Sequence, residues 1–284
     1  MAYHRPPWAP SDVDIEVPSA ARMYDFYLGG SHNFPADQKL AKEYIQAVPD
    51  MPVIARAQRA VLHRAVRYMA ADAGIDQFLD LGSGIPTVGA VHEIARETQP
   101  GARVVYVDCD PVATAHTAAM LDGVDGVGVL YADLRSPASV LSNPVVTETL
   151  DLSRPVAVLM IAVLHFVPDQ DDPIGVVAAY RDSTVGGSYL AITHATSDYL
   201  PDLAARAEAV YKRASHQISY RSRKQILAML DGYELVEPGL TDMICWRPDP
   251  GRGPDPLGGD VRRYSGYAAV GRRPTGEIAP DDDQ

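Results

Sequence analysis

Phe78-Leu79-Asp80-Leu81-Gly82-Ser83-Gly84 decides the fold of this chain. An apolar strand that ends in Asp-Leu-Gly-x-Gly is typical of the first strand-to-helix turn in an open α/β sheet of Rossmann type. Glycine has no Cβ, so Gly82 and Gly84 allow the backbone to approach a ligand closely. The stretch therefore predicts a site for a small anionic or zwitterionic ligand at the carboxyl end of this strand.

The next apolar run, Val104 to Asp108, also ends in a carboxylate. In a Rossmann-type sheet, an acid after the second strand accepts hydrogen bonds from ribose hydroxyls, so Asp108 indicates an adenosine-bearing cofactor. A dinucleotide-binding loop would carry a third glycine where Thr87 stands, and Pro86 is expected to open the following helix. The shorter glycine pattern favours S-adenosylmethionine (SAM).

Three backbone N–H groups are expected to bind the carboxylate end of SAM. They belong to Gly82, Ser83 and Gly84, and the helix that follows would add the positive end of its dipole. Asp108 would accept hydrogen bonds from both ribose hydroxyls. The alternative is that the three residues form only a tight turn between a strand and a helix.

From residue 77 onward, strand patterns alternate with helical patterns. Strands are expected at 77–81, 103–107, 128–131, 156–163, 188–193, 233–236 and 266–270, and helices at 87–98, 111–121, 138–141, 173–184 and 222–230. Asp110 is expected to cap the helix that starts at Pro111. Strands that alternate with helices need crossover connections, so the pattern predicts a parallel sheet with helices on both faces.

Residues 1–75 do not follow this alternation. Helices are expected at 19–28, which ends at Gly29-Gly30, and at 37–48 and 52–71. These helices are too short to form a core alone, and docked on the carboxyl edge of the sheet they would make a lid. We therefore expect an N-terminal arm and helical lid at 1–75, a SAM-binding domain at 76–271 and a disordered tail at 272–284.

Composition narrows the classes of partner and the compartment. The chain has 284 residues, two cysteines and a formal net charge of -12. The negative charge disfavours nucleic-acid binding, and the basic stretch from Arg206 to Lys224 is expected to be a solvated helical face with its connecting loop. The cysteines suit a reducing cytoplasm and lack metal-ligand spacing. The apolar run at 155–167 is too short to cross a membrane, and no signal peptide is recognisable.

Four motifs resemble those of the class I SAM-dependent methyltransferases. Besides the Asp80–Gly84 loop and Asp108, they are Tyr131-Ala132-Asp133-Leu134-Arg135 after the third strand and Ala162-Val163-Leu164-His165-Phe166 after the fourth. More narrowly, SAARMYDFYLGG at 19–30 and NFPAD at 33–37 resemble an actinobacterial family of SAM methyltransferases, formerly a domain of unknown function. The likeness extends from about Pro18 to Arg273.

The resemblance implies a seven-stranded, mostly parallel sheet whose last strand is antiparallel. It also implies that the adenine amino group of SAM donates to the Asp133 carboxylate and a nearby backbone carbonyl, and Leu134 belongs to the same cofactor-binding set. Alternatively, Asp133 only begins the turn at 134–137. Arg22, which lies among aromatic residues, would bind the carboxylate of SAM or an acidic substrate, or else form a surface ion pair.

His165 follows the fourth strand, where ligand-facing residues gather in an open α/β sheet. As a general base it would take a proton from the acceptor, although it could equally pack beside the adenine or close the loop. His194 ends the fifth strand nearby. With Tyr24, Tyr27 and Tyr211 it is expected to line a substrate pocket, although each aromatic residue is more often part of a core.

The sequence thus predicts a SAM-dependent methyltransferase that acts on a small-molecule acceptor, with transfer to oxygen or nitrogen favoured. The acceptor atom would attack the sulfonium methyl in line with the departing sulfur, helped mainly by proximity and exclusion of water. One alternative is a SAM-binding sensor without catalysis. Another is a nucleotide-dependent oxidoreductase, against which Thr87 argues.

Overall fold

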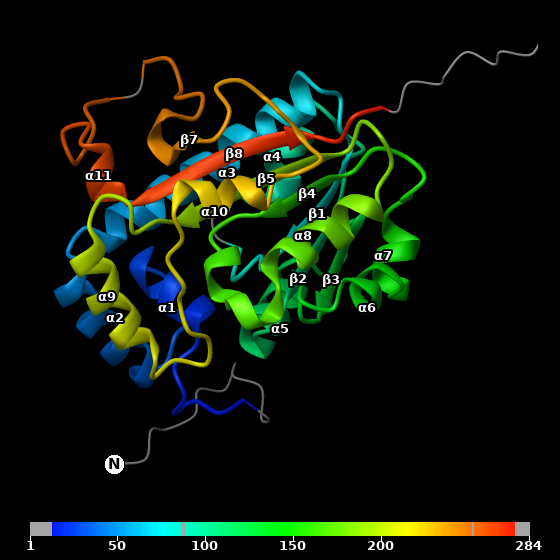
Figure 1. The fold of residues 1–284 in the computed structure, drawn as a ribbon. Helices are drawn as coiled ribbons and strands as arrows, with labels where there is room; N and C mark the ends of the chain where they lie inside the picture. Colours follow the sequence, from blue (N-terminus) through cyan, green and yellow to red (C-terminus); the bar gives the residue numbers. More distant parts are fainter. Residues whose placement is uncertain (1–12, 87–88, 252, 276–284) are drawn as a thin grey trace, which may run out of the picture.

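The computed structural model describes residues 13–86, 89–251 and 253–275. Its centre is an 8-stranded sheet of order β3-β2-β1-β4-β5-β8-β6, with β7 paired to β8 (Figure 1). The strands are β1 (Gln77–Leu81), β2 (Arg103–Asp108), β3 (Val127–Tyr131), β4 (Ala157–Met160), β5 (Tyr189–Ala195), β6 (Glu234–Leu235), β7 (Thr241–Asp242) and β8 (Gly266–Arg272).

The sheet is mostly parallel, as predicted. β1, β2, β3, β4 and β5 pair in parallel, whereas β8 runs antiparallel to β5. Every residue of β1 and β4 is buried, which explains their continuous apolar runs, because strands covered on both faces need no polar side. The prediction of seven strands missed β7, which has two residues.

β4 is shorter than the predicted run at 156–163. The strand ends at Met160, and Ala162 then has a positive φ of 57°, while its N–H donates to Oγ1 of Thr193 at 2.8 Å. A short 3₁₀ turn, η1 (Leu164–Phe166), follows. The apolar composition of 161–163 therefore reflects contact with the loops above the sheet, not strand pairing.

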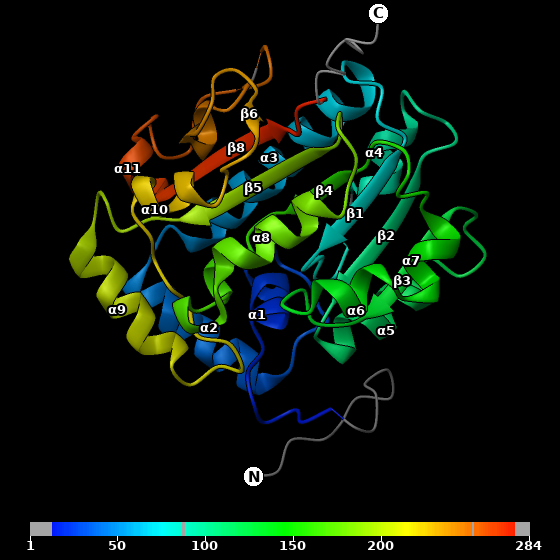
Figure 2. The same cartoon turned by 45° about the vertical axis from the view of Figure 1, so that its right-hand side comes forward.

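Helices cover both faces of the sheet (Figure 2). They are α1 (Ala20–Tyr27), α2 (Pro35–Ala47), α3 (Met51–Ala71), α4 (Val91–Arg96), α5 (Pro111–Met120), α6 (Pro137–Leu141), α7 (Pro144–Thr149), α8 (Pro173–Asp182), α9 (Pro201–Tyr211), α10 (Arg223–Ala228) and α11 (Val261–Tyr264). Alternate residues of β1 enter two cores: Phe78 packs with α3 and α4, and Leu79 packs with α6, α7 and α8.

Two helix starts test the sequence patterns. Asp110 caps α5 as predicted, because its carboxylate accepts from the N–H groups of Val112 and Ala113. The prediction that Pro86 opens the next helix is wrong. α4 begins at Val91, after Ala90, whose N–H donates to the Glu93 carboxylate at 2.9 Å. Thr87, where that helix was expected to start, lies outside the described residues.

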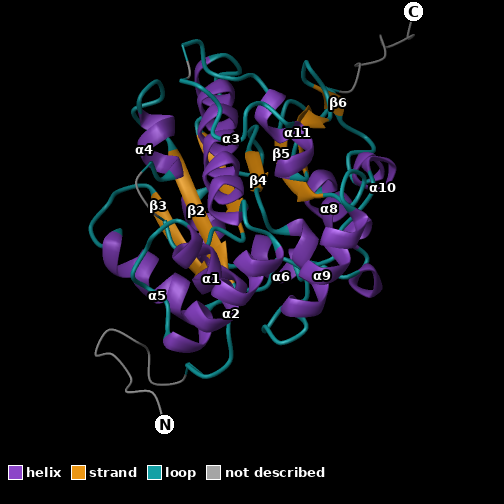
Figure 3. Ribbon diagram, turned by 90° about the vertical axis from the view of Figure 1, so that its left-hand side faces the viewer, coloured by secondary structure: helices purple, strands orange, loops and turns teal. Residues whose placement is uncertain are grey.

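The N-terminal helices differ in how they join the sheet. α3 shares the core of β1 and β4 through residues such as Val61, Ala65 and Met69, and it lies along the sheet in Figure 3. α1 and α2 gather with α9 beyond the carboxyl ends of the parallel strands (Figure 1). Only α1 and α2 therefore occupy the place expected for a lid.

The carboxyl-terminal boundary also differs from the predicted one. β8 continues to Arg272, and the N–H of Arg273 donates to the carbonyl of Ser188 at 2.7 Å. The sheet therefore continues past residue 271, where the predicted SAM-binding domain ends. Residues 276–284 of the predicted tail lie outside the described part of the chain.

Candidate active site

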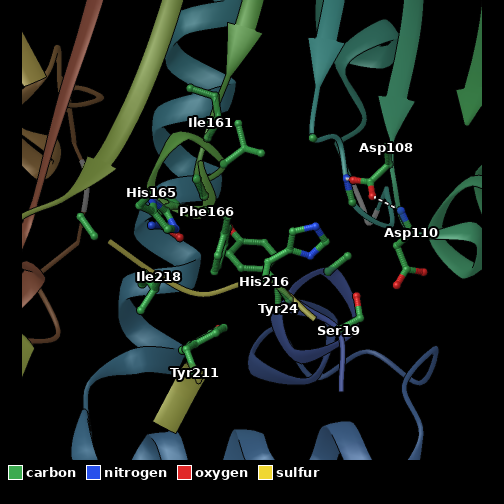
Figure 4. Close-up of a pocket in the computed structure, with 18 of the residues that line it drawn as sticks. Ser19, Tyr24, Asp108, Asp110, Ile161, His165, Phe166, Tyr211, His216 and Ile218 are labelled. Atoms are coloured by element: carbon green, nitrogen blue, oxygen red, sulfur yellow. Dashed lines mark hydrogen bonds between the residues drawn. The ribbon is translucent and has the colours of Figure 1, made fainter. Parts of the chain in front are cut away.

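A cavity of about 360 Å³ lies at the carboxyl ends of the parallel strands. Figure 4 shows Asp108 and Asp110 at one end of it, and His165, Phe166 and Tyr211 at the other. We call the first the polar end, formed by the loops after β1, β2 and β3. We call the second the aromatic end, lined by Tyr27, Tyr44, Phe166, Tyr211, Ile218 and Tyr220.

The glycine loop after β1 needs glycine for two different reasons. Gly82 has φ 70°, and a Cβ there would lie 2.3 Å from Cγ2 of Val163, so no side chain fits. Gly84 has φ 61°, and a Cβ there would have nothing within 4 Å. The loop thus packs tightly on the side of Val163 and leaves free space next to Gly84, which fits a ligand at the polar end.

The N–H groups of this loop do not point to a ligand as predicted. Those of Gly82 and Ser83 donate to the carbonyl of Val107 at 2.8 and 3.1 Å. The N–H of Gly84 donates to the Asp108 carboxylate at 2.7 Å. Because α4 starts only at Val91, its dipole also does not begin next to the loop. The loop therefore shapes the cavity wall, and its N–H groups donate to other groups of the protein.

Asp108 is held rigidly at the end of β2. One carboxylate oxygen accepts from Gly84, and the other accepts from the N–H of Asp110 at 2.8 Å. Each oxygen keeps a second lone pair, so the carboxylate can still accept from a pair of hydroxyl groups. Burial raises the pKa of Asp108 to about 6, despite these two backbone hydrogen bonds. Asp108 is thus a rigidly held acceptor at the polar end.

Asp80 is a cavity-lining acid that our sequence analysis did not assign to the site. It lies in β1 with 6% exposure, and burial together with the charge of Asp108 raises its pKa to about 7, against the opposing charge of Arg59. Arg59, on α3, donates to the carbonyl of Gly89 at 3.0 Å. The sequence did indicate a role for Asp80, because this residue stands in an apolar strand and a buried carboxylate there needs a partner.

Asp133 and Leu134 also line the polar end. Arg135 donates from Nε to both oxygens of Asp133 at 3.0 Å. Burial acts to raise the pKa of Asp133, but the hydrogen bonds and charge of Arg135 outweigh it, so the pKa is lowered. The carbonyl of Leu134 accepts from the hydroxyl of Tyr180 at 3.0 Å. Asp133 is therefore an ionised acceptor at the rim of the cavity.

Arg22 lies at the cavity wall, but its ion pairs are buried. Its Nε donates to Asp37 at 3.0 Å, its Nη2 donates to the carbonyl of Val17 at 2.6 Å, and its Nη1 lies 3.4 Å from the Asp110 carboxylate. The side chain is 3% exposed. The alternative of a surface ion pair is wrong, because this network joins α1, α2 and the cap of α5.

His165 and His194 lie side by side, with ring centroids 5.6 Å apart. His194 uses both ring nitrogens: Nδ1 donates to the carbonyl of Ala195 at 2.7 Å, and Nε2 accepts from Arg221 at 3.0 Å. In contrast, neither ring nitrogen of His165 has a hydrogen-bond partner among the described residues. Of the two histidines, His165 is the one whose ring nitrogens are not engaged by the described part of the protein.

Burial keeps both imidazoles neutral. It lowers the pKa of His165 well below its usual value, and the charges of His194 and Arg221 act in the same direction. It lowers the pKa of His194 to about 3. A neutral imidazole can accept a proton, so His165 is in the protonation state that a general base requires.

Arg221 corrects the prediction of a solvated basic face. It is 2% exposed, and it donates to the carbonyls of Leu164 and Val167 at 3.1 and 2.7 Å. It also donates to Asp169, on the outer side of the same loop. Arg221 therefore fixes the loop that carries His165, which was not foreseeable because these residues are far apart in the sequence.

The predicted pocket tyrosines all line the cavity. The hydroxyl of Tyr24 donates to the carbonyl of Ala55 at 3.0 Å. Tyr27 and Tyr211 are each 3% exposed, and burial raises the pKa of both hydroxyls, so they stay protonated. The sequence analysis missed Tyr44, whose hydroxyl is 2.8 Å from that of Tyr220.

His216 is a further cavity residue that the sequence did not single out, and it lies between the two ends in Figure 4. Its Nε2 is 3.8 Å from Sγ of Cys109. Burial raises the pKa of Cys109 to about 12, so this sulfur is a thiol at neutral pH.

The described part of the chain holds no cluster of three or more His, Cys, Asp or Glu that could bind a metal ion. In the same part, every helix is too short or too polar to span a membrane.

The sheet order, the two-glycine turn after β1 and the buried acid after β2 together define a class I SAM-dependent methyltransferase. A family model described as S-adenosyl methyltransferase matches residues 6–274. The chain belongs to this family, and its cofactor is SAM. The alternative of a nucleotide-dependent oxidoreductase is thereby excluded.

Two solved structures are similar over nearly the whole chain. A candidate methyltransferase from Thermobifida fusca YX is 39% identical, and the match covers 95% of this chain and 100% of that one, with a TM-score of 0.87. A DUF574 family protein from Streptomyces avermitilis MA-4680 is 37% identical, and the match covers 92% of this chain and 99% of that one, also with a TM-score of 0.87. No curated protein matches the sequence.

Proposed function

We propose that this methyltransferase transfers the methyl group of SAM to an oxygen or nitrogen atom of a small molecule bound at the aromatic end. The observation that carries the proposal is that one cavity joins the polar end, which suits the cofactor, to a second space lined by aromatic side chains. A sensor that only binds SAM would not need this second space. An enzyme requires it for the acceptor.

At the polar end, four groups and an open space would hold the cofactor. Asp108 would accept from the ribose hydroxyls, and Asp133 with the backbone near Leu134 would bind the adenine amino group. The open space next to Gly84 would admit the methionine part. Nη1 of Arg22 lies 3.4 Å from the Asp110 carboxylate, a longer contact than those made by Nε and Nη2. It is therefore the guanidinium nitrogen that would bind the methionine carboxylate.

SAM supplies an electrophilic methyl group on a positively charged sulfur. The protein brings the acceptor atom into line with that methyl group and excludes water around both. His165 would take the proton that leaves the acceptor O–H or N–H as the new bond to carbon forms. The total charge of the site then stays the same, because the charge lost at sulfur reappears on the imidazole. This balance allows even a buried imidazole to accept the proton.

The proposal is tested first on the cofactor and then on turnover. Asp108→Ala should weaken SAM binding roughly thirty- to a thousandfold in titration calorimetry, because it removes charge-assisted hydrogen bonds. Asp122→Ala, on the exposed surface, is the matched control and should bind as the wild type does. Small phenols, amines and carboxylic acids are then screened for release of S-adenosylhomocysteine (SAH).

Unchanged affinity in a folded Asp108→Ala variant would contradict the placement of the ribose. If no small molecule is methylated while a macromolecular acceptor is, the proposal of a small-molecule substrate fails and the family's methyltransferase activity stands.

A further inference from the structure

The charged residues that line the cavity are all on one side of it. They belong to segment 13–22, to Arg59 on α3 and to the loops after β1, β2 and β3. The elements that form the aromatic end are α2, the loop after β4, the end of β5, α9 and segment 215–220. Among the described residues, none of these elements contributes an Asp, Glu, Lys or Arg side chain to the cavity wall.

The charges behind this wall are compensated. The guanidinium of Arg221 is paired with Asp169, and its other hydrogen bonds go to loop carbonyls and to His194. Arg221 is therefore not free to pair with an anion at the aromatic end, and the Glu208 carboxylate lies behind this end, where it accepts from the N–H of Tyr220 at 3.2 Å. A carboxylate or ammonium group there would lose its hydration without gaining a partner, which is strongly unfavourable.

The rings of the aromatic end favour a flat, apolar ligand. Tyr44 and Tyr211 pack edge to face, with centroids 4.9 Å apart, and Phe166 lies 5.5 Å from Tyr211. Faces and edges of this kind bind another aromatic ring well. Ile218 and Ile161 add aliphatic surface to the same wall (Figure 4).

Three residues that line the cavity each have a buried polar atom without a hydrogen bond among the described residues. The atoms are the hydroxyl of Tyr27, Oε1 of Gln58 and Nδ1 of His165, and these residues are 3%, 6% and 5% exposed. Buried polar atoms are normally paired, so these unpaired atoms beside the cavity favour a ligand that offers them a hydrogen bond. The Oε1 atom of an amide only accepts, which calls for a ligand that donates.

We infer that the acceptor is an uncharged, mainly aromatic molecule with a hydroxyl group that donates a hydrogen bond to His165. The inference rests on the proposed function, because it assigns a substrate class to the same cavity. A neutral phenol is the simplest member of this class, and aromatic carboxylates and arylalkylammonium ions are excluded from it.

Three probes that share a hydroxynaphthalene ring test the inference at pH 7.5: 2-naphthol, 6-hydroxy-2-naphthoate and 6-(aminomethyl)-2-naphthol. Their binding to protein saturated with SAH is measured by calorimetry, so that no turnover is needed. We expect 2-naphthol to bind at least about tenfold more tightly than either charged probe, because only it enters without losing the hydration of a charge.

Two variants locate the probe. Ile218→Trp fills the aromatic end and should weaken 2-naphthol binding by about tenfold or more while SAH affinity stays within about twofold. Leu227→Trp, at an exposed position of α10 outside the cavity wall, should change neither affinity. SAH affinity also shows whether Ile218→Trp is folded.

Equal or tighter binding of a charged probe would overturn the inference. So would a failure of 2-naphthol to bind the SAH complex, or binding that Ile218→Trp leaves unchanged. Failure of the wild-type protein to bind SAH would instead contradict the proposed function at the polar end, and the inference with it.

Discussion

Nη1 of Arg221 donates a hydrogen bond to Nε2 of His194 over 3.0 Å, and this contact fixes the tautomer of the histidine. Because a guanidinium only donates, Nε2 must be bare, and the proton sits on Nδ1, which donates to Ala195. The same arginine donates to two carbonyls on either side of His165. The position of the proposed base is therefore set by a residue that does not contact it through a hydrogen bond.

Arg221→Met should lower the free energy of unfolding by about 2 to 4 kcal/mol, because it leaves the carbonyls of Leu164 and Val167 and Nε2 of His194 without their donor. The contribution of Asp169 is small, since that side chain is 77% exposed. Urea unfolding measures the change. Arg262→Met, at an exposed ion pair, serves as the control and should resemble the wild type. A folded Arg221→Met protein of wild-type stability would show that the loop is held by other contacts.

SAH affinity should increase as pH rises from 5 to 8. The pKa of Asp108 is raised to about 6 and that of Asp80 to about 7, so both carboxyls of the free protein are protonated at pH 5 and ionised at pH 8. Ionised Asp108 is the form that accepts from both ribose hydroxyls, so binding releases protons. Calorimetric titrations over this pH range measure the effect.

The matched control for that experiment is Asp80→Asn, which keeps the shape of the side chain. The substitution should remove the change in SAH affinity near pH 7. It also deletes a negative charge beside Asp108, so the remaining change, which follows the ionisation of Asp108, should move to lower pH. An affinity that is independent of pH in both proteins would place the cofactor away from these carboxyls.

His165→Asn should slow methyl transfer by about a hundredfold while SAM affinity stays within a few fold. Asparagine can form a hydrogen bond but cannot take the proton. Because burial lowers the pKa of His165 well below 6.5, the wild-type rate should be flat from pH 6.5 to 8 once SAM is saturating. Steady-state release of SAH from a methylated acceptor is the measurement. A full rate in the variant at every pH would remove the base role and leave the methyltransferase intact.

α1 should be protected from hydrogen exchange even without a ligand. Asp37 accepts from the N–H groups of Ser19 and Phe34 and from Arg22, all within a buried network that anchors the helix. SAH should therefore slow exchange more in residues 13–18 and 82–84 than in residues 20–27. Strong, ligand-dependent protection of α1 would instead support a lid that closes over the cofactor.

The sequence predicted the sheet well because its parallel strands are buried on both faces. Runs such as Val104 to Val107 have no polar alternation, and the turn residues at Asp110-Pro111 mark where a helix must begin. The helix after β1 was placed too early, because Pro86 suits a helix start but is equally compatible with the bend found there.

The positions of Asp108 and Asp133 in the cavity wall were predictable, because Asp108 ends β2 and Asp133 lies just after β3. The hydrogen bonds of the glycine loop were not, since they depend on the carbonyl of Val107 in a neighbouring strand. Arg221 and Gln58 lie on segments remote from the SAM motifs. Only the packing of the folded chain brings Arg221 to the loop that carries His165, and Gln58 to the same cavity as His165. A lone arginine in a basic stretch carries no sequence signal for burial.

The hydrogen bond between the hydroxyls of Tyr44 and Tyr220 joins parts of the chain 176 residues apart, across the end of the cavity that faces away from the cofactor acids. Neither tyrosine belongs to a loop that follows a strand of the parallel sheet. Substitutions at these two positions can therefore reshape the proposed acceptor space while the turns around Gly82 and Asp108 keep their geometry. Substitutions intended to admit a larger or differently substituted acceptor should therefore begin at α2 and segment 215–220, where a change in selectivity is expected to leave the binding of the methyl donor intact.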